Sequence, residues 1–327
     1  MTSLIENLGS DRCVYAHQIN LLNDTVLLVQ LTETELTEHS FLDERIFRPD
    51  MKFEWVPWDQ FEAKTASLPS EPPSYIFHIG HCGSTLLSRL LAAATGTSAL
   101  REPLPLRTFA IDCADGNAGM LGDEALGRRL RSFERVWAPA TIKATSICSN
   151  VIDRVSADAP VVFLYQQAET HLAVILAGEN ALQDLRGFGQ NRYRRLVAFA
   201  PDLPPLASLS IGELAAMTWL AEISSGSKGV TGREVLKLDF DAFLQQPEEF
   251  LANVCKALDL SATAESCTAA VAGPIMRTYS KAPEHAYGPK LRDDVIADSR
   301  QRNAAEISKG MQLIDRFRST TCGADWS

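Results

Sequence analysis

The amino-acid sequence predicts an α/β fold: a parallel sheet covered by helices on both faces, with a small β-containing appendage at the N-terminus. The main observation is an alternation along the chain. Short runs rich in β-branched and aromatic residues are followed by longer stretches whose apolar residues recur at helical spacing. Strands that alternate with helices in this way form parallel sheets, and ligand groups then gather at the carboxyl ends of the strands.

Residues 1–66 form the predicted appendage. Val14–Ile19 and Thr25–Leu31 have the composition of strands, and the turn residues Asn23 and Asp24 between them predict a β-hairpin. Four aromatic residues follow, and we expect them to pack the appendage onto the main body: Phe53, Trp55, Trp58 and Phe61.

A proline- and serine-rich stretch, residues 67–74, is the predicted joint, and residues 75–327 then form the main α/β domain. Beyond its first strand and helix, the elements predicted in order are a loop over Asp112–Asp123, a helix over Glu124–Trp137, a strand over Thr141–Thr145, a helix through Val151 and Ile152, a strand over Pro160–Tyr165, helices over Leu172–Leu196 and Ile211–Ile223, a strand over Val235–Phe240, and helices over Phe250–Leu258 and Ala304–Phe317.

The stretch from Ser74 to Leu91 is the one on which the functional prediction depends. Tyr75, Phe77 and Ile79 lie in a short apolar run that is typical of a buried parallel strand. After the glycine-containing loop 80–85, four leucines fall on one face of a predicted helix: Leu86, Leu87, Leu90 and Leu91. The order is therefore strand, glycine-rich turn and helix.

Such a turn can hold a phosphate or a sulfate. Glycine lets backbone amides approach an anion closely, and the uncapped N–H groups of the first helical turn point toward it with the helix dipole behind them. Hydroxyl groups of the same loop can add donors. The predicted ligand contacts are Gly80, Cys82, Gly83, Ser84 and Thr85. The alternative is an ordinary strand–turn–helix corner without a ligand.

The loop lacks the lysine that the Walker A pattern places before its Ser or Thr, because Ser84 follows Gly83 directly. A kinase or ATPase is therefore disfavoured. The stretch instead resembles the 5′-phosphosulfate loop of the sulfotransferase superfamily, written P-K-S-G-T-T or G-R-S-G-T-T-L-L, with Gly-Ser-Thr-Leu-Leu from Gly83 to Leu87 matching its second half. His81 occupies the position of the basic residue, and the resemblance implies that it contacts the phosphate or the transferring group.

The resemblance extends over about residues 74 to 260. Thr141–Thr145 is similar to the family's strand that ends in Lys-Thr or Lys-Ser, which implies that Lys143 contacts the transferring sulfuryl group. A cation there stabilises the transition state more than the ground state. The segment around Asp239 and Asp241 resembles the family's Y-E-D-L-x-x-x-P strand, and one of these aspartates is expected to cap the following turn.

An acceptor hydroxyl or amine needs a base to take its proton as the new bond forms. Glu102 is the first candidate, since several bacterial members of the superfamily carry a similar Glu-Pro at this point, and Asp112 is its rival. The family's cytosolic branch would place a histidine two residues beyond the strand lysine, but that position is Thr145. A helix-capping or surface role for Glu102 stays open.

The family's donor is 3′-phosphoadenosine 5′-phosphosulfate, and its 3′-phosphate is recognised by an arginine and a serine that this chain lacks. Gln166 and Gln167 stand where the arginine is expected, and an amide lacks the charged fork of a guanidinium. Basic residues elsewhere can compensate: Arg192, Arg194 and Arg195, or Lys281, Lys290 and Arg292.

Composition limits the classes of function. A formal charge of −10 and a pI near 5.2 disfavour a nucleic-acid binder. The seven cysteines are odd in number and contain no C-x-x-C pair, which indicates reduced thiols in the cytoplasm. No signal peptide and no membrane span is expected. His78, His81 and Cys82 have no fourth ligand nearby in the sequence, so no metal is expected.

The sequence as a whole predicts a cytosolic sulfotransferase-like enzyme that moves a sulfuryl group from a phosphosulfate nucleotide to a hydroxyl or amine of a small molecule or peptide. Two alternatives stay open. One is a non-catalytic or regulatory nucleotide-binding module. The other is a phosphotransferase with a phosphate loop of another type, which requires Mg²⁺.

Overall fold

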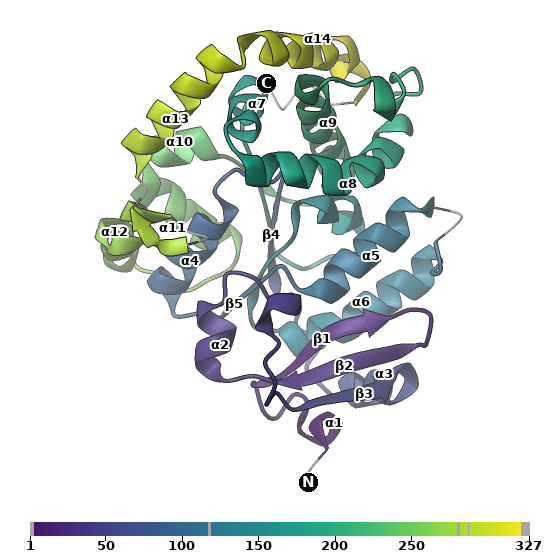
Figure 1. Ribbon diagram of the computed structural model, residues 1–327. Coiled ribbons are helices and arrows are strands. Elements are labelled where there is room, and N and C mark those ends of the chain that lie inside the picture. Colours follow the sequence, from purple (N-terminus) through teal and green to yellow (C-terminus); the bar gives the residue numbers. More distant parts are fainter. Residues whose placement is uncertain (1–2, 117–118, 280–281, 287, 322–327) are drawn as a thin grey trace.

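The computed structural model describes residues 3–116, 119–279, 282–286 and 288–321. It confirms the predicted α/β fold (Figure 1). Five parallel strands form the central sheet in the order β5-β6-β4-β7-β8. Their bounds are β4 Ser74–His78, β5 Ala99–Arg101, β6 Thr141–Lys143, β7 Val161–Tyr165 and β8 Leu236–Asp239.

The central strand is β4, and all five of its residues are buried. A strand with both faces covered is expected to be a continuous apolar run, which is why Tyr75, Ile76 and Phe77 follow one another without alternation. The helix after it, α4 (Ser84–Thr95), begins at the carboxyl edge of the sheet. The glycine-rich loop is therefore placed at the middle of that edge.

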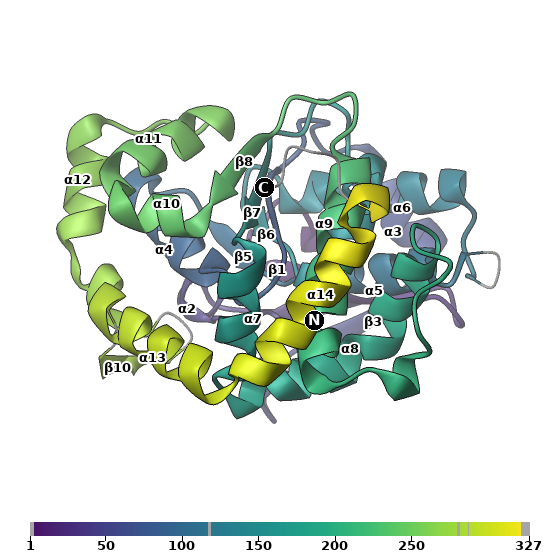
Figure 2. The same ribbon diagram turned by 90° about the horizontal axis from the view of Figure 1, so that it is seen from above.

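Helices cover both faces of the sheet, and Figure 2 shows the two groups on either side of the strands. On one side α4 packs with α11 and α12, and on the other α9 packs with α8, α14 and a 3-10 segment, η3. The helices of this domain are α5 Leu104–Ala114, α6 Asp123–Trp137, η3 Ser146–Arg154, α7 Ala168–Leu176, α8 Glu179–Val197, η4 Leu206–Ser208, α9 Ile211–Gly229, α10 Phe240–Gln245, α11 Pro247–Ala257, α12 Ala264–Ala272, η5 Pro274–Arg277, α13 Pro289–Arg302 and α14 Ala304–Thr321, and a small antiparallel pair, β9 Thr278–Tyr279 and β10 Ala282–Ala286, precedes α13.

Two of the predicted elements differ from the structure. The single helix expected over Leu172–Leu196 is two helices, α7 and α8, because the backbone of Gly178 is extended and interrupts the turns. Apolar spacing continues across the break, so periodicity alone does not reveal it. The loop expected from Asp112 begins later, since α5 includes Asp112, whose carboxylate accepts the backbone N–H groups of Met120 and Leu121.

The N-terminal part contains the predicted hairpin, β1 Val14–Asn20 and β2 Thr25–Gln30, and a third antiparallel strand, β3 Phe53–Pro57, that the sequence analysis did not predict. It also contains α1 Leu4–Asn7, α2 Glu33–Glu38, η1 Glu44–Ile46 and α3 Trp58–Ala66. Its sheet lies beside α5 and α6 (Figure 1).

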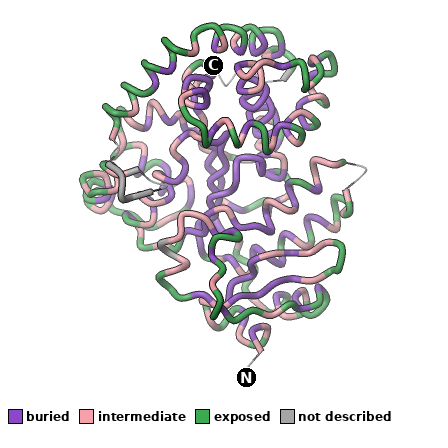
Figure 3. The backbone as a smooth tube through the Cα atoms, viewed as in Figure 1, coloured by how far each residue is buried: buried purple, intermediate pink, exposed green. Residues whose placement is uncertain are grey.

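Only half of the aromatic cluster packs against the main body. The rings of Trp58 and Phe61 lie 6.3 and 4.9 Å from that of Phe133 on α6. Phe53 and Trp55 are exposed on β3. The buried apolar residues of the N-terminal sheet and of the central sheet nevertheless form one continuous cluster, and Figure 3 shows buried backbone running through both.

None of the helices within the described ranges combines the length with the apolar composition that crossing a bilayer requires.

Helix α14 touches α9 backbone to backbone. A Cβ on Gly310 would lie 2.6 Å from the carbonyl oxygen of Gly212 and 2.5 Å from a methyl carbon of Leu172. The Gly212 N–H in turn donates to the Glu306 carboxylate at 2.9 Å. The approach of these two helices therefore requires glycine at position 310.

We expect Gly310→Ala to lower the free energy of unfolding by roughly 1–3 kcal/mol, the usual cost of inserting a methyl group into a packed contact. The matched control is Gly187→Ala on α8, where a Cβ meets nothing within 4 Å. That change should raise stability by roughly 0.5–1 kcal/mol through helix propensity. Urea unfolding of the two variants measures both values, and equal effects would contradict the close approach.

Candidate active site

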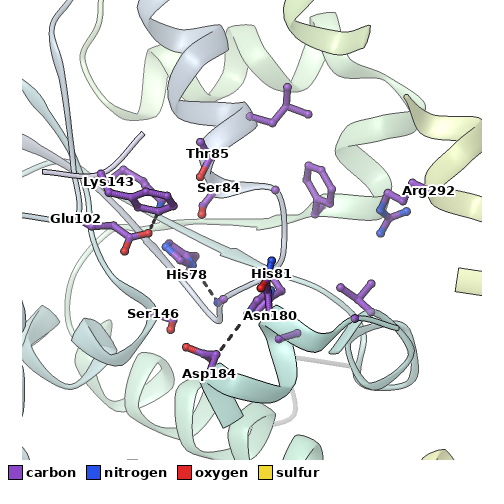
Figure 4. A pocket seen from close by; sticks show the side chains of 18 of the residues that line it. His78, His81, Ser84, Thr85, Glu102, Lys143, Ser146, Asn180, Asp184 and Arg292 are labelled. Carbon is purple, nitrogen blue, oxygen red and sulfur yellow. Dashed lines mark hydrogen bonds and ion pairs between the residues drawn. The ribbon is translucent and has the colours of Figure 1, made fainter. Parts of the chain in front are cut away.

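A cavity of about 810 Å³ opens at the carboxyl edge of the sheet. The loop after β4 lines it through Gly80, His81, Gly83, Ser84 and Thr85. Figure 4 shows this loop between Lys143 and Glu102 on one side and Arg292 on the other. The position agrees with the rule that ligands of parallel α/β sheets bind beyond the carboxyl ends of the strands.

The loop has an unusual backbone conformation. Gly80, His81 and Gly83 all have left-handed φ values, of +84°, +51° and +78°. Gly83 is required for a second reason, because a Cβ there would lie 2.1 Å from the ring of Phe240. A side chain at this position would have to displace that ring from the cavity wall.

His78 fixes the start of the loop. Its Nδ1 accepts the Gly80 N–H at 2.9 Å, which leaves the proton on Nε2, and Nε2 then donates to the Ala144 carbonyl oxygen at 2.8 Å. The imidazole therefore connects the end of β4 to the segment after β6. It orients the loop, and Figure 4 shows it below Ser84 and Thr85 in that view.

The N-terminus of α4 has unpaired groups that can bind an anion. Gly83 is its N-cap and provides no side-chain cap, so the N–H groups of the first turn have no acceptor within the helix. Ser84 lines the cavity beside the first turn of the helix. The Thr85 hydroxyl is buried and has no partner within the described ranges. Buried polar groups are normally satisfied, so this helix end fits a phosphate or sulfate.

Lys143 and Glu102, predicted separately, are in contact. Lys143 is 1% exposed, and its ammonium group forms a short ion pair with the Glu102 carboxylate. Strand pairing causes this, since Arg101 on β5 lies opposite Lys143 on β6 and the Glu102 N–H donates to the Lys143 carbonyl oxygen at 2.7 Å. An ammonium group and a carboxylate thus lie together beside the loop (Figure 4).

His81 faces a carboxylate that the sequence analysis missed. Its Nε2 lies 3.8 Å from Asp184 on α8. Asp184 also accepts from Arg192 at 2.9 Å. Burial alone would raise the pKa of Asp184, but its contacts with Arg192 and His81 lower it. The resulting pKa lies well below the usual range of an aspartate. Asp184 therefore stays ionised and places a negative charge beside His81.

Arg192 connects this group to the core. It is completely buried, and it donates to the Ser146 hydroxyl at 3.2 Å and to Glu222 on α9 at 3.1 Å. Glu222 also binds Arg195 at 2.6 Å. Nothing in the local sequence indicates this network, because its members lie on α8, α9 and η3.

The cations that line the described cavity are all paired with carboxylates. The pairs are Lys143 with Glu102, Arg45 with Asp43, Arg107 with Glu44, and Arg292 with Asp241. The side chains therefore give the cavity little net charge. Binding of an anion in the cavity would therefore depend on the backbone N–H groups of α4 and on the displacement of a carboxylate from its paired cation.

Several predicted contacts lie outside the cavity. Cys82 is buried with its thiol 3.5 Å from the Leu164 carbonyl oxygen. Gln166 is buried too, and its carbonyl oxygen accepts the Trp219 indole N–H. Arg194 is half exposed and forms an ion pair with Asp115.

The remaining predicted residues divide in the same way. Lys290 is exposed on α13 and does not line the cavity, whereas Arg292, two residues later, does. Asp112 holds the turn after α5 and is not available as a base. Asp239 caps α10 as predicted, accepting the Asp241 N–H at 2.8 Å. Lys281 lies outside the described residues.

Comparisons with known proteins give similarity in structure. No protein-family model matches the sequence, and no curated protein does. One similar solved structure is the sulfotransferase domain from the curacin biosynthetic pathway, with 12% identity, coverage of 79% of this chain and 100% of that one, and a TM-score of 0.41. Another is sulfotransferase STF9 from Mycobacterium avium, with 11% identity, coverage of 75% of this chain and 80% of that one, and a TM-score of 0.40. A sulfotransferase from Alicyclobacillus acidocaldarius is also similar, with 15% identity, coverage of 73% of this chain and 97% of that one, and a TM-score of 0.36. All three are sulfotransferases, and the similarity is one of fold.

The downward pKa shift of Asp184 predicts how its contribution to stability depends on pH. A carboxylate whose pKa is lower in the folded state stabilises the fold above its unfolded pKa of about 4, and this contribution is lost as the pH falls toward the folded value. Asp184→Asn should therefore cost roughly 3 kcal/mol at pH 7, on the scale of a broken buried pair, and less below pH 4.

Urea unfolding between pH 7 and pH 2.5 measures this difference. The matched control is Asp298→Asn, which removes an exposed carboxylate 2.6 Å from Arg302 and should change stability by less than about 1 kcal/mol. A loss for Asp184→Asn that is constant over the whole pH range would show that the charge of Asp184 is not responsible.

Proposed function

We propose that this chain is a sulfotransferase-like enzyme that transfers a sulfuryl group from 3′-phosphoadenosine 5′-phosphosulfate to a hydroxyl or amine acceptor. The observation that carries the proposal is the buried Lys143–Glu102 ion pair beside the uncapped N-terminus of α4. That arrangement supplies an anion site, a cation and a base within one cavity.

The donor's phosphosulfate end binds at the loop. The free N–H groups of the first turn of α4 and the hydroxyls of Ser84 and Thr85 hold its oxygens, and the helix dipole favours their charge. The His81 imidazole, whose Nε2 lies 3.8 Å from Asp184, faces the donor from the other side of the loop. Cys82 and Gly80 contribute through the backbone, since the Cys82 thiol points into the core.

The transfer step forms a bond between the acceptor oxygen or nitrogen and sulfur, and it breaks the bond between sulfur and the donor phosphate oxygen. Glu102 takes the acceptor proton. As its carboxylate becomes neutral, its attraction for Lys143 falls, and the ammonium group is free to neutralise the charge that grows on the leaving phosphate oxygen. Preorganised charges of this kind stabilise the transition state more than the bound substrate.

Of the basic residues predicted to compensate for the missing 3′-phosphate site, Arg292 is the one that lines the described cavity, and it is held by Asp241. We therefore expect adenosine 3′,5′-bisphosphate and ADP to bind within roughly tenfold of each other, an energy difference of about 1.4 kcal/mol. Calorimetry with each nucleotide, with and without Mg²⁺, measures this. A preference far above tenfold would mean that Arg292 leaves Asp241 on binding, and Asp241→Asn should then strengthen binding of the bisphosphate.

Lys143→Met should lower kcat by roughly 10²-fold or more, because one preorganised donor to the transition state is lost, and it should change nucleotide affinity much less. Glu102→Gln should also lower kcat by roughly 10²-fold or more, because the group that takes the acceptor proton has gone. The double variant Lys143→Met/Glu102→Gln leaves no buried unpaired charge and tests whether folding is affected. Lys309→Met, which removes an exposed lysine paired with Glu306, is the control. Unchanged kcat in Lys143→Met would contradict the proposed mechanism.

A non-catalytic nucleotide-binding module is the second candidate. It is favoured by the carboxylate partners of the cavity cations, which weaken the attraction for a highly charged donor. Nucleotide binding without turnover of any acceptor would support it, and turnover that depends on Mg²⁺ would indicate a phosphotransferase instead.

A further inference from the structure

The N-terminal part of the chain contributes to the cavity through one segment, residues 39–46. Three hydrogen bonds hold this segment against the main domain. The Leu42 N–H donates to the Arg101 carbonyl oxygen at 2.8 Å, and the Arg101 guanidinium donates to the His39 carbonyl oxygen at 2.9 Å. Arg89 on α4 donates to the Ser40 hydroxyl at 3.0 Å. The segment is therefore fixed beside β5.

Segment 39–46 lines the cavity next to the proposed catalytic pair. The ring of Phe41 lies 5.5 Å from the Lys143 ammonium nitrogen, and the Arg45 guanidinium stacks on the same ring at 3.9 Å. Asp43 holds Arg45 through two contacts of 2.7 and 2.5 Å. Phe41, Asp43 and Arg45 all line the cavity.

The order of the strands determines whether the acceptor or the nucleotide donor faces segment 39–46. Glu102 follows β5 and Lys143 ends β6, on one side of the loop. The apolar cavity residues on the other side follow β7 and β8: Val174, Phe240 and Leu244. The acceptor must reach the base, so it lies on the Glu102 side and faces segment 39–46. The apolar side is left for the flat base of the nucleotide.

The wall on the acceptor side is dense in polar groups but balanced in charge. Asp43 pairs with Arg45, Glu44 with Arg107, and Glu102 with Lys143. Thr145 lines the same side, and its hydroxyl oxygen is buried without a hydrogen-bond partner in the described parts of the chain. An unsatisfied hydroxyl of this kind costs stability until a ligand bonds to it.

This chemistry selects among acceptors. A phenol or a sterol needs apolar walls, and among the described residues that follow β5 and β6 or belong to segment 39–46, Phe41 is the one that brings an apolar ring to the cavity. A charged acceptor would leave one member of an ion pair opposed by a like charge. A molecule with many hydroxyl groups donates and accepts at once, so it can bond to carboxylates and guanidinium groups together without a net charge.

We infer that the acceptor is a neutral polyhydroxylated molecule of the sugar class, held by segment 39–46 and by Thr145. This inference rests on the proposed sulfuryl transfer. One sugar hydroxyl forms the new bond to sulfur and gives its proton to Glu102, while the bond from sulfur to the donor phosphate breaks. The neighbouring hydroxyls bond to Asp43, Arg45 and Thr145.

The first test compares four acceptors with 3′-phosphoadenosine 5′-phosphosulfate as donor: methyl glucoside, 4-nitrophenol, 2-aminoethanol and glycolate. Mass spectrometry measures the sulfated product, and calorimetry with adenosine 3′,5′-bisphosphate measures nucleotide binding separately. We expect kcat/KM for methyl glucoside to exceed that for each of the others at least tenfold.

The second test changes the wall. Asp43→Asn/Arg45→Gln replaces both members of one pair with neutral residues of similar shape, and Thr145→Val removes only a hydroxyl. Each should lower kcat/KM for methyl glucoside about tenfold or more and leave the affinity for adenosine 3′,5′-bisphosphate within twofold. Asp298→Asn/Arg302→Gln removes a comparable pair on the surface of α13 and should change neither quantity.

Each failure has a separate meaning. Preferred sulfation of 4-nitrophenol or of a charged acceptor overturns the inference and leaves the proposed function standing. Sulfation of methyl glucoside that neither wall variant reduces overturns the role of segment 39–46. Loss of nucleotide binding in the wall variants would show that these residues have a structural role, and it would also overturn the role of segment 39–46 in binding the acceptor. No nucleotide binding and no product with any acceptor overturns the proposed function itself.

Discussion

The structure depends on the burial of β4 at the centre of the parallel sheet. A strand covered on both faces can place hydrogen-bonding side chains most easily at its ends, and Ser74 bonds to Thr141 at one end while His78 bonds at the other. His78 holds both Gly80 and the segment after β6. The turn that follows is thereby set by the core, and α4 begins where its free N–H groups face the cavity.

A second constraint is the buried charge of Glu222. Removing a carboxylate from water costs several kcal/mol, and here two guanidinium groups and the Ser149 hydroxyl offset that cost. Because Arg192 and Arg195 reach Glu222 from α8, the ion network fixes α8 against α9. The same Arg192 holds Asp184, and Asp184 faces His81. A structural network of the core thus extends to the loop that we propose as the donor site.

The balanced charge of the cavity limits what binds there. A strongly basic pocket would attract any polyanion, whereas paired cations release their charge only to a ligand that replaces the carboxylate with good geometry. The protein as a whole is acidic, with a formal charge of −10, so long-range attraction does not help an anionic donor. Affinity then depends on the oriented N–H groups of α4 and on local rearrangement of pairs such as Lys143–Glu102.

The sequence by itself determined four of the five strands of the central sheet and the glycine-rich loop after β4, because apolar runs, helical spacing and glycines at positions with left-handed φ are local features. It did not predict β5, which is only three residues long. It also singled out Lys143 and Glu102 as separate residues. It also predicted ligand contacts for Cys82, Gln166, Arg194 and Lys290, which are not among the residues that line the described cavity.

Only the tertiary structure decided which of these groups meet. The contact between Lys143 and Glu102 follows from the pairing of β5 with β6, and Asp184 reaches His81 because the network at Glu222 positions α8. Segment 39–46 joins the site from the other end of the chain. Periodicity records which face of an element is buried but not its partner. The chemistry of a site assembled from distant elements is therefore set by packing.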